Sequence, residues 1–209
     1  YKRYGMSEVV YLVDDDPAVM RALSRLLGAE GFEVACFADA TSFLAAHDPA
    51  RSGCAVIDLG LPDLDGLELQ GRLAEADRCR QILFLTGQGT IPASVRAMRA
   101  GAVDFLTKPV EPVELIQSIR AAIERDRTLR LRKAAVDADR ARLASLTPRE
   151  TEVMEQVAAG RLNKQIADRL GAAEKTIKVH RGRVMHKLGV RSVADLVRLL
   201  ARARNGEGG

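Results

Sequence analysis

The sequence of 209 residues contains no tryptophan, and aromatic residues make up only 4% of it. Binding of single-stranded nucleic acid by stacking bases on aromatic side chains is therefore disfavoured. The chain has three cysteines, Cys36, Cys54 and Cys79, and they form no CxxC pair. An odd number of cysteines without this spacing argues against a disulfide framework or a zinc site, so we expect reduced thiols.

Long apolar segments are missing as well. No stretch of the sequence approaches the roughly 20 apolar residues that a helix needs to cross a bilayer. The N-terminal residues also lack the charged-then-apolar pattern of a signal peptide. We therefore expect a cytoplasmic protein that has no membrane partner.

What the chain does have is charge, and this charge is unevenly distributed. Residues 1–126 contain 13 basic and 19 acidic side chains, a net charge of −6, whereas residues 127–209 contain 19 basic and 9 acidic ones, a net charge of +10. An acidic front half joined to a basic back half indicates two modules with different partners. The basic half is the candidate for binding a polyanion such as nucleic acid.

Short apolar runs alternate with helical patterns through the front half. Runs that are apolar almost throughout are typical of strands buried on both faces of a parallel sheet. The alternation predicts an α/β domain with a doubly wound, five-stranded parallel sheet of the flavodoxin-like type. Asp16 before Pro17 predicts the cap of the first helix. The predicted strands are 9–13, 33–37, 54–57, 82–85 and 103–106, and the predicted helices are 17–30, 40–46, 65–76, 91–100 and 111–125.

The back half contains only helical patterns. Residues 126–144 carry loosely spaced Arg, Ala and Asp residues, which predict a helical linker that is solvated or paired with a partner. Thr147-Pro148, with Glu150 one turn later, signals the start of a new helix. Glycines then separate short helices, which predicts a small all-α, four-helix domain over 145–205. Its predicted helices are 148–159, 163–170, 174–188 and 192–203.

Polar side chains follow the strands of the predicted sheet. Right-handed crossovers bring the C-terminal ends of parallel strands to one edge, and four of these ends carry Asp14, Asp15, Asp58, Thr86 and Lys108. Converging carboxylates repel one another unless a cation lies between them, and oxygen ligands in a small cleft suit Mg²⁺. An ammonium and a hydroxyl nearby can hold a phosphoryl group. Asp58 is then the natural nucleophile for forming an acyl phosphate.

Four segments resemble the receiver domain of two-component response regulators: LVDDD at 12–16, IDLGLPDLDG at 57–66, LTG at 85–87 and KP at 108–109. The resemblance covers nearly all of the front half, so we predict a receiver domain over 6–125. It implies that Asp58 accepts a phosphoryl group from a histidine kinase. It also implies that Asp15, Asp58 and the carbonyl of Gly60 ligate Mg²⁺, with Asp14 acting through water.

The same resemblance assigns the remaining groups of the predicted site. Thr86 and Lys108 would contact the phosphoryl oxygens, and Phe105 stands at the position of a switch aromatic residue that turns inward on activation. The Lys108–Pro109 peptide bond is cis in this family. Relatives often carry arginine where this chain has Gly60, but only the carbonyl is needed, so metal binding is expected to survive.

Two short predicted helices of the basic half are joined by Gly171-Ala172-Ala173. This layout is typical of a helix-turn-helix, whose second helix enters the major groove of DNA. A basic face opposite an apolar face also fits a solvated amphipathic helix, but the charge of +10 on residues 127–209 favours DNA. The second helix carries Lys175, Lys178, Arg181, Arg183 and Lys187.

Further segments of the basic half resemble the LuxR-type DNA-binding domain: LTPRE at 146–150, NKQIA at 163–167, TIKVH at 176–180 and KL at 187–188. With the receiver in front, the chain is similar to response regulators of the NarL/FixJ family. Two segments resemble the FixJ-like branch: TGQG at 86–89 and AVDF at 102–105. By this resemblance Lys178 and Val179 face bases, whereas phosphates are the expected contacts of Lys164, Thr176 and Arg181.

Two positions of the predicted recognition helix depart from the family pattern. Ala173 stands where relatives usually have a serine that caps the helix. Gly182 offers no side chain at a position that faces the groove. Both departures leave the base preference open.

The resemblance implies a transcription regulator rather than an enzyme, whose receiver assists only its own phosphoryl transfer and dephosphorylation. Phosphorylation by a cognate histidine kinase is expected to repack the surface made by the helix at 91–100, the strand at 103–107 and the helix from 111. Repacking would drive homodimerisation and binding to paired half-sites of double-stranded DNA. RNA polymerase is a further expected partner.

Two alternatives stay open. One is a phosphorylation-independent DNA-binding regulator with a vestigial receiver, although all five residues of the predicted site are present. The other is a phosphatase that forms an aspartyl phosphate, like the haloacid dehalogenases. Those enzymes carry a DxDx[TV] motif after their first strand, whereas this chain has DDDP at 14–17, and its predicted nucleophile, Asp58, follows the third strand.

Overall fold

The computed structural model describes residues 8–87 and 91–205. The chain divides into two compact units, Tyr1–Arg130 and Leu131–Gly209. Two predictions fall outside the described residues: the start of the receiver domain at 6–7 and residues 88–89 of the FixJ-like segment. Within the described part of the chain, none of the helices combines the length and the apolar character that crossing a membrane requires.

The first unit is built on a parallel sheet whose order, among the described residues, is β2-β1-β3-β4-β5. The chain steps outward from β1 in both directions, which is the doubly wound topology predicted from the sequence. β1, β3 and β4 are buried along their whole length, as their apolar runs predicted, while β2 at the edge is partly exposed. The strands are β1 (Val9–Val13), β2 (Glu33–Phe37), β3 (Gly53–Ile57), β4 (Gln81–Thr86) and β5 (Asp104–Thr107).

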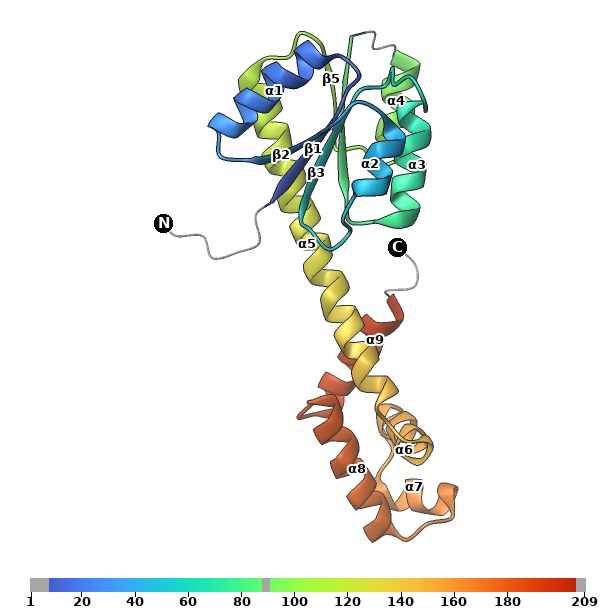
Figure 1. Ribbon diagram of the computed structural model, residues 1–209. Helices are drawn as coiled ribbons and strands as arrows, with labels where there is room; N and C mark the ends of the chain where they lie inside the picture. Colours follow the sequence, from blue (N-terminus) through green and yellow to red (C-terminus); the bar gives the residue numbers. More distant parts are fainter. Residues whose placement is uncertain (1–7, 88–90, 206–209) are drawn as a thin grey trace. The chain divides into compact units, whose positions relative to one another are not determined.

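Helices cover both faces of this sheet (Figure 1). On one face, α1 and the first part of α5 bury Leu27 and Ile119 against the strands. On the other face, α2, α3 and α4 pack around Phe43, Leu73 and Phe84. Because both faces are apolar, polar groups gather at the two edges where the strands begin and end. The helices are α1 (Pro17–Ala29), α2 (Ala40–Ala46), α3 (Gly66–Ala76), α4 (Ile91–Arg99) and α5 (Pro112–Ala144).

The second unit contains the short helices predicted for the basic half. Thr147 and Glu150 form the expected capping box at the start of α6: the hydroxyl of Thr147 accepts from the backbone N–H of Glu150 at 3.3 Å, and the carboxylate of Glu150 accepts from the backbone N–H of Thr147 at 2.9 Å. Gly171 ends α7 in a left-handed conformation, φ 60°, and the chain turns directly into α8. These helices are α6 (Pro148–Ala158), α7 (Asn163–Leu170), α8 (Glu174–Leu188) and α9 (Val193–Asn205).

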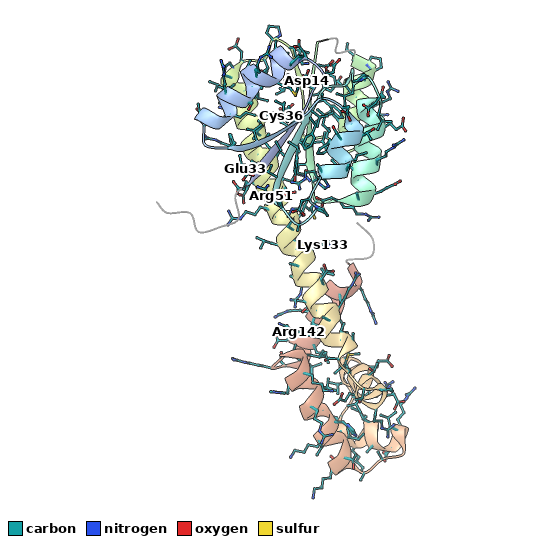
Figure 2. The ribbon with its side chains drawn as sticks, viewed as in Figure 1. Asp14, Glu33, Cys36, Arg51, Lys133 and Arg142 are labelled. Atoms are coloured by element: carbon teal, nitrogen blue, oxygen red, sulfur yellow. The ribbon has the colours of Figure 1, made fainter. Side chains whose placement is uncertain are left out.

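The last helix predicted for the front half and the predicted linker form one continuous helix, α5. The boundary between the two units falls within this helix, after Arg130. Two acids of the predicted linker, Asp126 and Asp139, are buried, with exposed fractions of 0% and 3%, whereas other side chains of the linker are solvated, such as those of Lys133 at 70% and Arg142 at 51% (Figure 2). Each carboxylate is paired inside its own unit, Asp126 with Arg130 at 2.8 Å and Asp139 with Arg202 at 2.9 Å.

A group of charged side chains, the basal ion cluster, lies at the edge of the sheet where β3 and β4 begin; it consists of the buried Asp77, Arg80 and Asp126 and the half-buried Arg130. Arg130 donates to Asp77 at 2.6 Å and to Asp126 at 2.8 Å. The side chain of Arg80 is fully buried, and its Nη1 lies 3.9 Å from Oδ1 of Asp126. Burial alone would raise the pKa of Asp77, but hydrogen bonds with His47 and Arg130 outweigh burial and lower this pKa to about 2. Asp77 therefore stays ionised at neutral pH.

Candidate functional site

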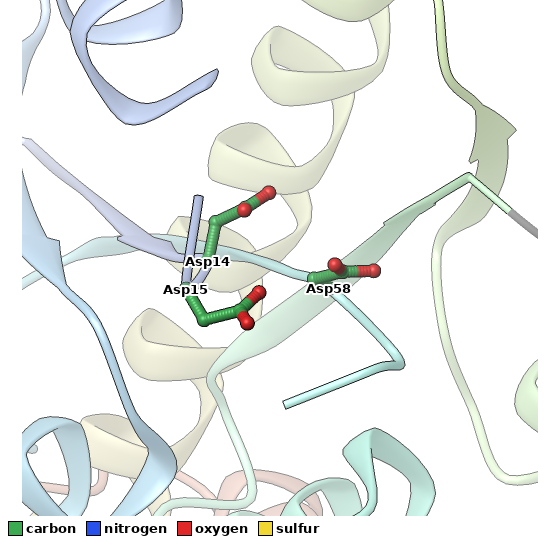
Figure 3. Close-up of side chains that lie close together, drawn as sticks. All are labelled: Asp14, Asp15 and Asp58. Carbon is green, nitrogen blue, oxygen red and sulfur yellow. The ribbon is translucent and has the colours of Figure 1, made fainter. Parts of the chain in front are cut away.

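Three of the predicted site residues, Asp14, Asp15 and Asp58, come together at the C-terminal edge of the sheet (Figure 3). One carboxylate oxygen from each lies within 4.8 Å of the others. β1 and β3 pair in parallel with Val13 opposite Ile57, so the residues that follow these strands emerge side by side. Asp14 is buried, Asp58 is half-buried and Asp15 is exposed. Charges of one sign at this spacing favour a cation between them.

Lys108 reaches into this cluster from the end of β5, as predicted. Its Nζ donates to Oδ2 of Asp14 at 2.6 Å and to Oδ2 of Asp58 at 3.1 Å. Burial alone would lower the pKa of Lys108, but the hydrogen bonds and charges of the two acids outweigh burial and raise it. The ammonium is therefore protonated at neutral pH. The peptide bond from Lys108 to Pro109 is cis, as the family resemblance implied.

Thr86 and Phe105 lie on neighbouring strands, with Thr86 at the C-terminal edge and Phe105 one step back from it, opposite Phe84. Thr86 is the last residue of β4 and is buried, and its carbonyl accepts from the backbone N–H of Lys108 at 2.8 Å. Phe105 is half-buried on β5, and its ring lies 6.2 Å from that of Phe84 between centroids. An inward turn of Phe105 on activation stays a prediction. The five polar residues predicted for this site thus lie at one edge of the sheet.

The groups gathered here fit Mg²⁺. The three acids offer only oxygen atoms, the ligands that Mg²⁺ prefers, and the exposure of Asp15 lets waters complete the coordination. The backbone of Gly60 runs beside the cluster, because a Cβ at this position would lie 3.9 Å from Oδ2 of Asp58. A ligand role for the carbonyl of Gly60 stays a prediction.

Asp63 is a residue near this site that sequence reasoning missed. Its carboxylate accepts hydrogen bonds from the backbone N–H of Ala40 at 3.0 Å, the backbone N–H of Thr41 at 2.9 Å and the hydroxyl of Thr41 at 2.6 Å. The bond from the Thr41 hydroxyl, with those from the backbone, lowers the pKa of Asp63 to about 2. No local sequence pattern predicts this contact, because the partners are 22 and 23 residues away in the sequence.

The candidate nucleic-acid interface is the exposed face of α8 with the start of α7. Val179 is 47% exposed on α8, which fits an apolar contact to base methyl groups. Arg181 is half-buried, and its Nη1 donates to Oδ1 of Asn163 at 3.0 Å. The other predicted DNA-contacting residues are all exposed: Lys164, Lys175, Thr176, Lys178 and Arg183.

Lys187, predicted as a DNA contact, is engaged inside its own domain. Its Nζ donates to the carboxylate of Glu150 at 2.6 Å and to the carbonyl of Ser145 at 3.1 Å. The hydrogen bond from Lys187 is the largest cause of a lowered pKa of Glu150, about 2. This ion pair joins the start of α6 to the end of α8, so Lys187 has a structural role whether or not it also meets DNA.

The two departures from the family pattern are visible in α8. Ala173 is the N-cap residue of this helix, and its side chain forms no capping hydrogen bond. A Cβ added at Gly182 would meet nothing within 4 Å, so this position is an open gap on the helix surface. Neither position disturbs the helix itself, which runs from Glu174 to Leu188 as predicted.

Two families match the chain, one for each unit. Residues 10–120 match the response regulator receiver domain, and residues 144–200 match the luxR family of bacterial regulatory proteins. The first match contains the acidic cluster and Lys108, and the second contains α6, α7 and α8.

Similar proteins combine both units in one chain. Nodulation protein W of Bradyrhizobium diazoefficiens is 44% identical over 191 residues, which are 91% of this chain and 84% of that protein. Transcriptional regulatory protein FixJ of the same organism is 42% identical over 194 residues, 93% of this chain and 95% of that protein. The structure of the response regulator StyR matches with a TM-score of 0.86 at 41% identity, covering 94% of this chain and 99% of StyR.

Proposed function

The chain belongs to the NarL/FixJ family of response regulators, and from this premise we propose that phosphorylation of Asp58 by a histidine kinase drives its dimerisation and its binding to DNA. The combination of a receiver with a LuxR-type DNA-binding domain is that of a transcription regulator, not of a classic enzyme. We further propose that the protein acts in the cytoplasm, where DNA and RNA polymerase are found, and that its receiver assists only its own phosphorylation and dephosphorylation.

One observation carries this proposal: Lys108 contacts both Asp14 and Asp58 at the edge where Thr86 ends β4. A vestigial receiver, which is not phosphorylated, does not require an acid cluster, an ammonium and a hydroxyl at the ends of four strands. The phosphatase alternative is also disfavoured, because its nucleophile follows the first strand, whereas Asp58 follows the third strand, β3.

The chemistry assigns a task to each of these groups. A bond forms between a carboxylate oxygen of Asp58 and phosphorus while the nitrogen–phosphorus bond to the kinase histidine breaks, and the imidazole leaves with that electron pair. Lys108 offsets the negative charge of the phosphoryl oxygens, and the hydroxyl of Thr86 donates to one of them. Asp15, Asp58 and the Gly60 carbonyl would hold Mg²⁺, with Asp14 acting through water, and the ion would supply further positive charge at this point.

Formation of the acyl phosphate repacks the surface made by α4, β5 and the first part of α5. Three apolar side chains of α4 are unusually exposed there: Ile91 at 81%, Val95 at 43% and Met98 at 46%. Such residues support the proposal that two receivers associate through this surface once Thr86 and Phe105 have rearranged. A symmetric dimer then presents two α8 helices to paired half-sites of DNA.

Metal removal tests the phosphoryl-transfer step. The full chain is incubated with acetyl phosphate, first with Mg²⁺ and then with an excess of chelator, and its intact mass is measured. We expect a mass increase of one phosphoryl group with Mg²⁺ and almost none with chelator, because the three acids then repel the incoming anion. Equal labelling under both conditions would contradict the metal requirement, and continuous release of phosphate from simple esters would support the phosphatase alternative.

Salt dependence tests the DNA interface. Duplexes selected from random sequences by the phosphorylated chain serve as the probe. We expect Lys178→Ala to weaken binding to the selected duplex by about 1–3 kcal/mol, and Lys175→Ala to reduce the slope of log affinity against log salt by about 1. Lys187→Ala is expected to lower the melting temperature of the domain, because Glu150 loses its partner, while the slope stays unchanged. A reduced slope for Lys187→Ala would show that this residue does contact phosphate.

A further inference from the structure

The loop between β3 and α3, which carries the phosphoacceptor, is held at three points. At its start the backbone N–H of Asp58 donates to the carbonyl of Val13 at 2.9 Å. At its end the backbone N–H of Gly66 donates to the carbonyl of Leu59 at 3.3 Å, and a Cβ at Gly66 would lie only 3.0 Å from the carbonyl oxygen of Asp58. In the middle, Asp63 is clamped to the start of α2 by its three hydrogen bonds.

The clamp does more than cap α2, because this helix already has a cap of its own. The side chain of Asp39, its N-cap residue, accepts from the backbone N–H of Ser42 at 2.7 Å. Asp63 accepts from the two earlier N–H groups, those of Ala40 and Thr41, which have no partner within the helix. A carboxylate at a helix N-terminus is also favoured by the helix dipole. The result is a direct tie between α2 and the loop beside the phosphoacceptor.

We propose that Asp63 is a positioning residue for the Mg²⁺ site, one that holds the loop so that the Gly60 carbonyl and the Asp58 carboxylate face the ion together. The inference rests on the function proposed above. Gly60 has no side chain whose packing could orient its peptide, so its orientation depends on the neighbours that are fixed. These are Leu61, which is buried in the core with an exposed fraction of 8%, and Asp63 beyond it.

Calorimetric titration of Mg²⁺ into the full chain tests this role, and it suits a protein that has no tryptophan to report binding. Loss of groups that orient metal ligands typically costs 10- to 100-fold in affinity, so we expect Asp63→Ala to raise the Mg²⁺ dissociation constant about 10-fold. Thr41→Val removes one of the three hydrogen bonds without changing any charge, and it should give a smaller rise. Asp63→Asn keeps one acceptor oxygen and should lie between wild type and Asp63→Ala.

Two controls separate positioning from other effects. Asp39→Ala removes the cap that α2 supplies itself and leaves the loop untouched, so its Mg²⁺ affinity should stay close to that of wild type. Asp65→Asn removes a negative charge from the same loop, at a residue whose side chain accepts from the N–H of Leu67 in α3. Circular dichroism shows that each variant is folded before it is titrated.

The outcomes distinguish this inference from the proposed function. Asp63→Ala with wild-type Mg²⁺ affinity overturns the inference, and so does an equal loss in Asp39→Ala or Asp65→Asn, because stability of α2 or simple charge would then explain the effect. A wild-type chain that binds no Mg²⁺ overturns the proposed function itself. A rise that is confined to the Asp63 and Thr41 variants supports the positioning role.

Discussion

Replacing Asp58 by asparagine is expected to abolish phosphorylation of the chain, with a loss of at least about 100-fold in rate, as removal of a nucleophile does elsewhere. The amide nitrogen is not a nucleophile, so no acyl phosphate can form. The fold should persist, because Asp58 is only half-buried. The amide oxygen of the new asparagine can still accept from Lys108, whose Nζ lies 3.1 Å from Oδ2 of Asp58 in the wild-type chain. Intact mass after incubation with acetyl phosphate and Mg²⁺ measures the effect, and analytical ultracentrifugation shows whether dimers still form.

Asp65→Asn is the matched control for this variant. It makes the same chemical change in the same loop, but Asp65 is exposed, and its carboxylate accepts from the backbone N–H of Leu67 at the start of α3. We expect normal phosphorylation of this control. Labelling of Asp58→Asn at the wild-type level would contradict the assignment of the nucleophile.

The second large effect is expected at the opposite edge of the sheet, where Asp126→Ala should destabilise the first unit by about 3–5 kcal/mol. The carboxylate of Asp126 is fully buried and accepts from Ser52 Oγ at 2.8 Å, Gly53 N at 3.0 Å and Arg130 Nε at 2.8 Å. Its removal leaves these donors without an acceptor and leaves the buried guanidinium of Arg80 without its nearest charge on α5.

Urea unfolding of the full chain measures this effect on the transition of the first unit. Asp137→Ala serves as the control, because Asp137 is another acid of α5, but its side chain is 55% exposed and pairs with the exposed Lys133 at 3.5 Å. Pairs of that kind contribute about 0–1 kcal/mol, so the control should unfold almost like wild type. Equal stabilities of the two variants would show that the basal ion cluster does not hold α5 to the sheet.

The parts of the fold that the sequence predicts well are those set by local patterns. β1, β3 and β4 were recognisable because a strand covered on both faces must be apolar throughout. The acidic cluster was recognisable for a topological reason. Parallel strands such as β1 and β3 end at the same edge of the sheet, so the residues that follow them lie close together. The start of α1 was predicted from Asp16, whose side chain accepts from the backbone N–H of Ala18 at 2.7 Å.

The parts that the sequence does not predict depend on partners that are distant along the chain. Asp126 stands in a polar stretch and looks like any solvated acid, yet it is buried because Ser52, 74 residues earlier, and Arg130 both donate to it. Contact of Lys187 with DNA stays a prediction, but its ion pair with Glu150, 37 residues earlier, could not be predicted from the sequence. A pattern of charges reveals which side chains can form ion pairs, but not which of them the tertiary fold brings together.

One titration tests most directly whether phosphorylation at Asp58 controls DNA binding. The affinity of the full chain for a selected duplex is measured at fixed salt, with and without acetyl phosphate and Mg²⁺, for wild type and for Asp58→Asn. A dimer that engages two half-sites gains binding free energy from both, so we expect the affinity of the wild-type chain for DNA to rise at least about 10-fold on phosphorylation. Asp58→Asn should show no such rise. Equal affinity of the wild-type chain in both states would contradict the account and favour a DNA-binding regulator with a vestigial receiver.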